Sequence, residues 1–128
     1  MDREKLLDLY KKYELGKTDV YKHQHYVIIT RAGIERIAAK ENIAINYEVV
    51  KCDPNFAVVK AYAKKEAVEI QTFGSALKGA NYKDGNCNSW YVMEMAEKRA
   101  LSRSVLKLTG FYELGVFGED ESDDFKRK

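Results

Sequence analysis

Residues 89–110 of the chain read SWYVMEMAEKRALSRSVLKLTG. Ser89 is a residue type favoured at the N-cap of a helix, and Gly110 is the residue type that most often follows the last helical turn. We therefore predict the longest helix of the chain from Ser89 to about Thr109.

Basic side chains recur on this helix at four-residue intervals. Arg99, Arg103 and Lys107 form one stripe about two turns long, because residues four apart lie on the same helix face. Like charges at this spacing repel each other, and Glu94 and Glu97 fall on another face. The stripe therefore predicts an anionic partner in space. The alternative is a solvated face, or one that pairs with acidic residues from elsewhere in the chain.

Three β-strands are predicted before this helix. Hydrophobic and polar residues alternate over Ala44–Cys52 and Phe56–Ala63, and Val68–Ser75 is a third β-prone run. The connections, residues 53–55 (Asp-Pro-Asn) and 64–66 (Lys-Lys-Glu), are short turns. Short turns between neighbouring strands favour antiparallel pairing, which makes this region a β-meander.

The N-terminal part is predicted to contain two helices and a strand. Helical spacing covers residues 3–15 and Arg31–Glu41, with Thr30 as a cap for the second helix, and Tyr26–Thr30 is β-prone. A turn-rich segment, Asn81–Asn88, precedes the long helix. The predicted fold class is α+β: an antiparallel three- to four-stranded meander packed against a long C-terminal helix, with one or two N-terminal helices.

Length and charge predict one domain with a short tail. The chain has 128 residues, 45% of them hydrophobic. Residues 1–117 hold 19 Lys and Arg against 15 Asp and Glu, whereas residues 118–128 hold five acidic and three basic residues. We expect 1–117 to be a single nucleic-acid-binding domain and 118–128 to be a flexible acidic tail. The tail either aids solubility or competes with DNA for the basic face.

The N-terminus shows no secretory signal, and no apolar run is long enough for a membrane span, so we expect a cytoplasmic protein. Cys52 and Cys87 are then expected as reduced thiols, with one bridge as the alternative. Together with His23 and His25 they lack the spacing of zinc ligands. No Gly-rich phosphate-binding motif is present. We therefore expect a non-enzyme with no cofactor and no metal.

Further cations and aromatic rings accompany the stripe. The cations are expected on the hairpin, after the third strand and at the start of the second helix. Tyr82 lies in a polar loop and could stack on a base. Other rings, such as Tyr62 and Phe73, are assigned to the core or to a subunit interface. The predicted nucleic-acid contacts are Lys98, Arg99, Arg103, Lys107, Lys60, Lys64, Lys65, Arg31, Lys78 and Tyr82.

A meander followed by a helix containing Glu-Lys-Arg-Ala-Leu, residues 97–101, resembles the single-strand annealing proteins of homologous recombination. That superfamily includes the Erf and Sak phage recombinases and the eukaryotic Rad-type annealing protein. The resemblance spans residues 26–121 and implies that Lys98 and Arg99 line a groove for the DNA backbone. A further helix Arg of the family would fall at Ser102, and Arg103 is one position further on.

The function implied by the resemblance is single-stranded DNA binding and ATP-independent strand annealing in recombination and DNA repair, by a homo-oligomeric ring or filament. One alternative is a plain single-strand-binding protein that does not anneal. Another is a protein-interaction module, an inhibitor or adaptor that binds an acidic partner. A small metal-dependent nuclease is the most distant alternative.

Overall fold

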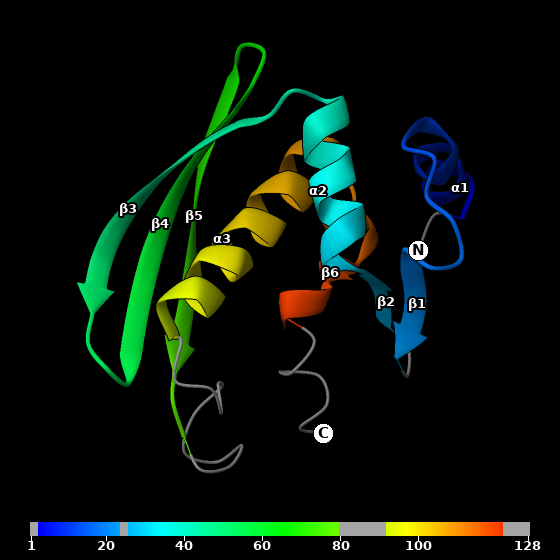
Figure 1. Cartoon of the computed structure of the whole chain (residues 1–128). Helices are drawn as coiled ribbons and strands as arrows, with labels where there is room; N and C mark the ends of the chain where they lie inside the picture. Colours follow the sequence, from blue (N-terminus) through cyan, green and yellow to red (C-terminus); the bar gives the residue numbers. More distant parts are fainter. Residues whose placement is uncertain (1–2, 24–25, 80–91, 122–128) are drawn as a thin grey trace.

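The computed structural model of the chain describes residues 3–23, 26–79 and 92–121 (Figure 1). Within them it has three α-helices and two three-stranded sheets, so the predicted α+β class is confirmed. The elements, in chain order, are α1 (Arg3–Lys12), β1 (Val20–His23), β2 (Tyr26–Ile29), α2 (Arg31–Lys40), β3 (Ala44–Cys52), β4 (Phe56–Lys65), β5 (Val68–Leu77), α3 (Val92–Thr109), the short 3-10 helix η1 (Tyr112–Leu114), β6 (Val116–Gly118) and a second 3-10 helix, η2 (Glu119–Glu121).

The predicted meander is the sheet β3-β4-β5, and both of its pairings are antiparallel. Alternate residues of β4, among them Ala57, Val59 and Ala61, are buried under α3, while the residues between them face the other side of the sheet. The alternation of β5 follows the same rule, because successive side chains of a strand point to opposite faces. This sheet therefore has an inner face, covered by α3, and an outer face.

Small residues let α3 lie directly on β5. A Cβ atom added to Gly74 would lie 2.1 Å from the backbone oxygen of Ala96 and 2.5 Å from the backbone nitrogen of Ala100. Thr72 donates a hydrogen bond of 3.0 Å to the Ala100 carbonyl, and its hydroxyl oxygen lies 2.6 Å from that of Ser104. The helix backbone is therefore in contact with the strand backbone.

A second layer covers the other side of α3, as Figure 1 shows. The sheet β1-β2-β6 joins β2 to β1 in antiparallel and to β6 in parallel orientation. Its residues Ile29 and Val116 share one core with Ile34 of α2 and with Val105 and Leu106 of α3. The strand predicted at 26–30 is β2, whereas β1, β6 and the second sheet were not predicted. Because of this sheet, α3 lies between two layers instead of on the surface.

The boundary expected between residues 117 and 118 falls inside β6, because Gly118 is its last residue and pairs with Ile29. The next three residues form η2, and residues 122–128 lie outside the described part of the chain. The turn expected at 81–88 and the start of the long helix at Ser89 also lie outside it. None of the helices within residues 3–23, 26–79 and 92–121 combines the length and the hydropathy needed to cross a bilayer.

Candidate nucleic-acid interface

Arg99 does not lie on a solvent-facing stripe. Its side chain is buried, with 4% of its surface exposed. The guanidinium donates one hydrogen bond of 2.9 Å to the Asp120 carbonyl and another of 2.8 Å to the Ser75 carbonyl. The assignment of Arg99 as a phosphate contact is therefore corrected: its donors serve backbone carbonyls at the junction of α3, β5 and η2. The physical reason is that α3 is covered on two sides, so that its four-residue repeat meets protein instead of water.

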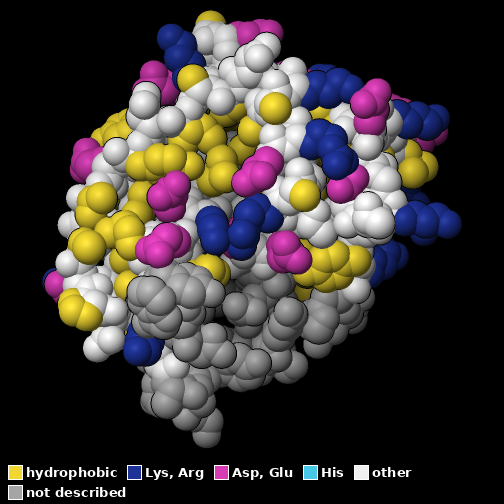
Figure 2. Space-filling model, in the orientation of Figure 1, with side chains coloured by type: hydrophobic (Ala, Val, Ile, Leu, Met, Phe, Trp, Pro, Cys, Tyr) yellow, Lys and Arg dark blue, Asp and Glu magenta, His cyan; other side chains and the backbone are white. Residues whose placement is uncertain are grey.

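The other cations of α3 have separate surroundings. Arg103 is half-buried and donates a hydrogen bond of 3.0 Å to the Phe73 carbonyl. Lys107 is exposed, and its ammonium lies 5.2 Å from the centre of the Tyr112 ring. Lys98 is half-buried. Figure 2 shows Lys and Arg scattered among Asp and Glu on this side of the molecule, so no continuous basic stripe is seen there.

The position at which the family resemblance expects an Arg holds a buried serine. Ser102 is 1% exposed and lies against β6, where a Cβ atom on Gly118 would be 2.7 Å from the Ser102 Cβ. A guanidinium has no space at this contact. The arrangement of cations on α3 therefore differs from the one that the resemblance implies.

Acidic residues cover the start of α2. Arg31 forms an ion pair of 2.9 Å with Asp120, and its backbone N–H donates a 3.2 Å hydrogen bond to the Glu119 carboxylate. The hydrogen bond that the Arg31 guanidinium donates to the Asp120 carboxylate is the main cause that raises the pKa of Arg31 above its ordinary value. Because Arg99 bonds to both Asp120 and Ser75, this acidic segment lies beside β5. Glu119 and Asp120, the first acidic residues of the predicted tail, thus bind Arg31, which we predicted as a nucleic-acid contact.

The outer face of the sheet β3-β4-β5 brings a lysine and two rings together. Lys60 on β4 lies opposite Phe73 on β5, and its ammonium is 5.0 Å from the Tyr62 ring centre and 5.6 Å from the Phe73 ring centre. Tyr62 also donates a 2.9 Å hydrogen bond to Glu48. Phe73 is 48% exposed, so it is not a core residue, and its other expected place, a subunit interface, stays a prediction. We call the set Lys60, Tyr62 and Phe73 the aromatic-lysine cluster.

A sequence signal for this cluster exists. Thr72, Gly74 and Ala76 are small, as a strand face pressed against a helix requires, and Phe73 stands between two of them. Side-chain alternation then directs Phe73 to the opposite face. The prediction missed this because it assigned large aromatic residues to the core or to an interface from their type alone. It did not consider which face of the strand Phe73 occupies.

The remaining predicted contacts are divided between two locations. Lys64 is exposed on the outer face, opposite Glu69, and Lys78 is exposed directly after β5. Lys65 is one residue further along β4, so its side chain points to the other face, where it forms an ion pair of 3.4 Å with Glu41 at the end of α2. Tyr82 lies outside the described residues. The structure therefore brings Lys60 and Lys64 to one surface and separates Lys65 from them.

Metal-ligating residues do not gather in the described part of the chain, where no group of three His, Cys, Asp or Glu side chains forms a candidate site. Cys52 is an exposed free thiol. Cys87 and His25 lie outside the described residues, as does the side chain of His23.

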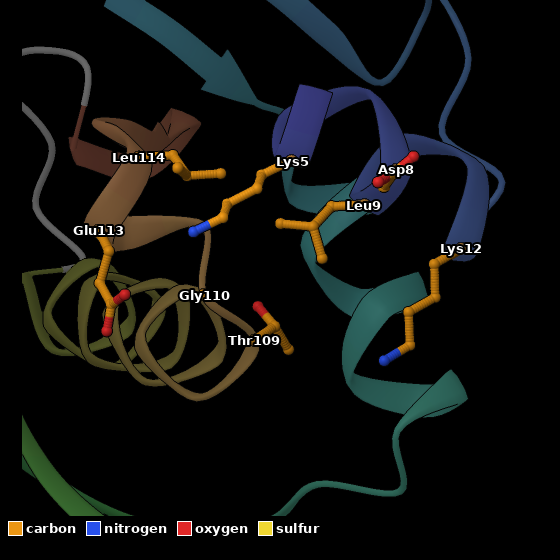
Figure 3. A pocket seen from close by; sticks show the side chains of 8 residues that line it. All are labelled: Lys5, Asp8, Leu9, Lys12, Thr109, Gly110, Glu113 and Leu114. Carbon is orange, nitrogen blue, oxygen red and sulfur yellow. The ribbon is translucent and has the colours of Figure 1, made fainter. Parts of the chain in front are cut away.

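A cavity of about 360 Å³ lies between α1 and the end of α3 (Figure 3). Lys5 and Lys12 line it together with Asp8 and Glu113, and Leu9 and Leu114 supply apolar walls. Two positive charges balance two negative charges, and the last carbonyls of a helix repel anions. The cavity therefore adds nothing to a phosphate-binding surface.

Comparisons of the chain with models of known protein families, with curated proteins and with solved structures found no match. The function is therefore argued from the geometry of these residues.

Proposed function

We propose that the protein binds single-stranded DNA on the outer face of the sheet β3-β4-β5, and that it acts as a non-enzymatic, cytoplasmic homo-oligomer. The observation that carries this proposal is the aromatic-lysine cluster, in which one ammonium lies next to two ring faces on an exposed sheet. Aromatic rings stack on nucleic-acid bases whatever their sequence, and a neighbouring lysine attracts the phosphate backbone. This pairing of ring and cation is what single-strand binding requires.

The contacts we propose come from neighbouring strands. Phe73 and Tyr62 would stack on bases, while Lys60, Lys64 and Lys78 would neutralise phosphates. Arg103, Lys107 and Lys98 stay secondary candidates on α3, and Arg99 is not among them. Phosphate contacts carry no base identity, so binding should be independent of sequence.

Strand annealing in recombination and DNA repair is the finer part of the proposal. A base held by its ring face keeps its hydrogen-bonding edge free for a complementary strand. Such a complex needs no ATP, because pairing of the two strands supplies the free energy. This part rests on the resemblance at residues 97–101 and on the stacking mode of the aromatic-lysine cluster.

Two substitutions separate stacking from phosphate attraction. Phe73→Ala should weaken the affinity for a dT oligonucleotide about tenfold, because one stacked base contributes about 1–3 kcal/mol, without changing the salt dependence. Lys60→Gln should make the slope of log affinity against log salt shallower by about 0.7, the contribution of one single-strand phosphate. Fluorescence anisotropy with a labelled oligonucleotide at several salt concentrations measures both quantities.

Matched controls exist on the same chain. Val68 is 57% exposed on β5 but lies on the opposite face, and Lys11 is exposed on α1. Val68→Ala and Lys11→Gln should leave affinity and slope unchanged. Equal losses in the control and test variants, or no loss at Phe73 and Lys60, would refute binding at the outer face. Binding without annealing of complementary strands would leave a plain single-strand binder.

The acidic segment at η2 gives a second test, because it lies beside β5 and neutralises Arg31. Glu119→Gln should raise DNA affinity by about twofold to fivefold at low salt, because it removes one negative charge beside β5 while the Arg31–Asp120 ion pair stays in place. The gain should vanish at high salt, where surface charges are screened. Oligonucleotide titrations at two salt concentrations measure the difference.

Glu4→Gln is the control for this test, since Glu4 is exposed on α1 and its substitution changes the net charge equally. An equal gain in both variants would mean that only net charge matters. No gain in Glu119→Gln would show that the segment does not compete with DNA. Deletion from residue 118 is a poorer test, because it also removes the Asp120 carbonyl that accepts from Arg99.

A protein-interaction module is the second candidate. It is favoured by exposed hydrophobic side chains on the same sheet, such as Leu77 and Val50, which are 41% and 51% exposed. A failure of the protein to bind dT oligonucleotides at low salt would select this alternative.

A further inference from the structure

The two edges of the sheet β3-β4-β5 differ. On the β5 side, the backbone hydrogen bond of 2.6 Å from Lys78 to Asn55 marks a hydrogen-bonded pair of the ladder. In antiparallel sheets such pairs alternate with non-hydrogen-bonded pairs. Phe73 and Ser75 therefore belong to non-hydrogen-bonded pairs and turn their N–H and C=O groups away from β4. Their carbonyls accept the hydrogen bonds from Arg103 and Arg99, so side chains of α3 occupy this edge.

The β3 edge is different. The same alternation, carried across β4 by the Glu48–Lys60 pair, turns the N–H and C=O groups of Ile45, Tyr47 and Val49 outward. Within the described residues β4 is the single strand that pairs with β3. A register shift between Val49 and Lys51 ends the regular part of this edge. The free edge is therefore a regular stretch from Ala44 to Val49.

The side chains next to this edge are unusually apolar for a solvent-exposed strand. Tyr47 is 39% exposed and Val49 57% exposed. Figure 2 shows hydrophobic side chains gathered along the side of the molecule where β3 lies. Burial, followed by the charge of Glu97, raises the pKa of Tyr47 to about 12, so its hydroxyl is uncharged at neutral pH. Exposed apolar edge strands pair readily with further strands.

We propose that the β3 edge binds the β3 edge of a second copy of this chain, antiparallel, with Tyr47 on the two-fold axis. Ile45 then lies opposite Val49 of the partner subunit, so that all three outward-turned residues of each edge are paired. A shift that places Tyr47 opposite the partner's Val49 would set Glu48 opposite the partner's Glu48, and like charges directly opposite each other are destabilising. The register with Tyr47 on the axis therefore avoids this repulsion and pairs all three outward-turned residues of each edge.

The two-fold symmetry of the proposed dimer follows from the difference between the β3 edge and the β5 edge. A ring built head to tail would require β3 of one copy to pair with β5 of the next, where Arg99 and Arg103 already hold the carbonyls. Pairing of β3 with itself closes as a two-fold dimer instead. The proposed dimer rests on the homo-oligomer part of the proposed function and makes it more specific, and its formation does not require DNA. It joins the two outer faces into one six-stranded surface with two aromatic-lysine clusters.

Disulfide trapping tests the interface in the absence of DNA. In a Cys52→Ser, Cys87→Ser background, Tyr47→Cys should give covalent dimers on mild oxidation, seen on a non-reducing gel. Cα atoms of such an opposite pair are about 5.5 Å apart, within the range that a disulfide bridges. Gln71→Cys, exposed on the outer face of β5, is the control and should stay monomeric on the gel.

Light scattering provides the second measurement. The unmodified chain should have twice the chain mass, and Val49→Lys should halve it with an unchanged circular dichroism spectrum, because a charged edge blocks strand pairing. A monomeric unmodified chain, equal trapping at Tyr47→Cys and Gln71→Cys, or an assembly that survives Val49→Lys would overturn the proposal. Oligonucleotide binding is measured separately: a trapped dimer that binds no DNA would refute the proposed function and keep the interface.

Discussion

Gly74→Ala is expected to lower the free energy of unfolding by about 3 kcal/mol, at the upper end of overpacking effects. The new Cβ would lie 2.1 Å from the Ala96 oxygen and 2.5 Å from the Ala100 nitrogen. Both atoms belong to the helix backbone, so no side-chain rotation can relieve the contact. The whole of α3 must move away from β5, and the hydrogen bond from Thr72 to Ala100 lengthens with it. Urea unfolding followed by circular dichroism measures the loss.

Gly16→Ala is the control for this substitution. A Cβ atom at Gly16 would meet a single atom, an Asp19 carboxylate oxygen at 3.9 Å. Its effect on the free energy of unfolding should stay within about 0.5 kcal/mol, the usual range for surface substitutions. If both variants unfolded at the same urea concentration as the unmodified chain, the close approach of α3 and β5 would be refuted.

Arg99→Gln is expected to be nearly as destabilising, with a loss of about 3 kcal/mol, because hydrogen bonds from a charged donor are lost in a buried place. The shorter amide cannot reach both the Ser75 and the Asp120 carbonyls, which the guanidinium joins at 2.8 and 2.9 Å. Lys107→Gln removes the same charge from the same helix at an exposed position and should cost less than about 0.5 kcal/mol. The two variants are compared by urea unfolding at the same pH and salt concentration.

Equal stability of Arg99→Gln and Lys107→Gln would mean that Arg99 is a surface cation after all. The comparison also guides work on DNA binding. A double replacement of Arg99 and Arg103 would lose stability together with charge, and weaker binding by that variant would not report on phosphate contacts. Lys60 and Lys64, which hold no structural carbonyl in the described residues, are the better positions for such a test.

Local patterns explain why most of the secondary structure could be predicted. The strands β3, β4 and β5 alternate in polarity and are joined by turns of a few residues, so each pairing depends on neighbours in sequence. The hydrogen bond from Gly33 to the Thr30 hydroxyl confirms the predicted cap of α2. The strands β1 and β6 escaped prediction because they are short and because β6 pairs with β2, about 90 residues away in the chain.

The candidate site was only partly predictable for the same reason. Lys60 and Lys64 were predicted as contacts and lie together on the outer face, and Phe73 joins Lys60 through the register of β4 and β5. Lys65 was predicted with them, but strand alternation places it on the other side of the sheet, where it pairs with Glu41. Whether a charge is free depends on partners that are distant in sequence, which spacing along one helix or strand does not reveal.

The α+β class, the meander and the long helix follow from the amino-acid sequence alone, because periodicity, caps and turns act between residues that are near each other in the chain. The faces that meet solvent could be identified only from the packing of the folded chain. Arg99 lies where β5 and η2 meet α3, so it becomes a buried donor to backbone carbonyls and not a surface cation. Burial depends on which layers pack together, and the apolar contacts that join α3 to β2, β6 and α2 connect residues far apart in the sequence.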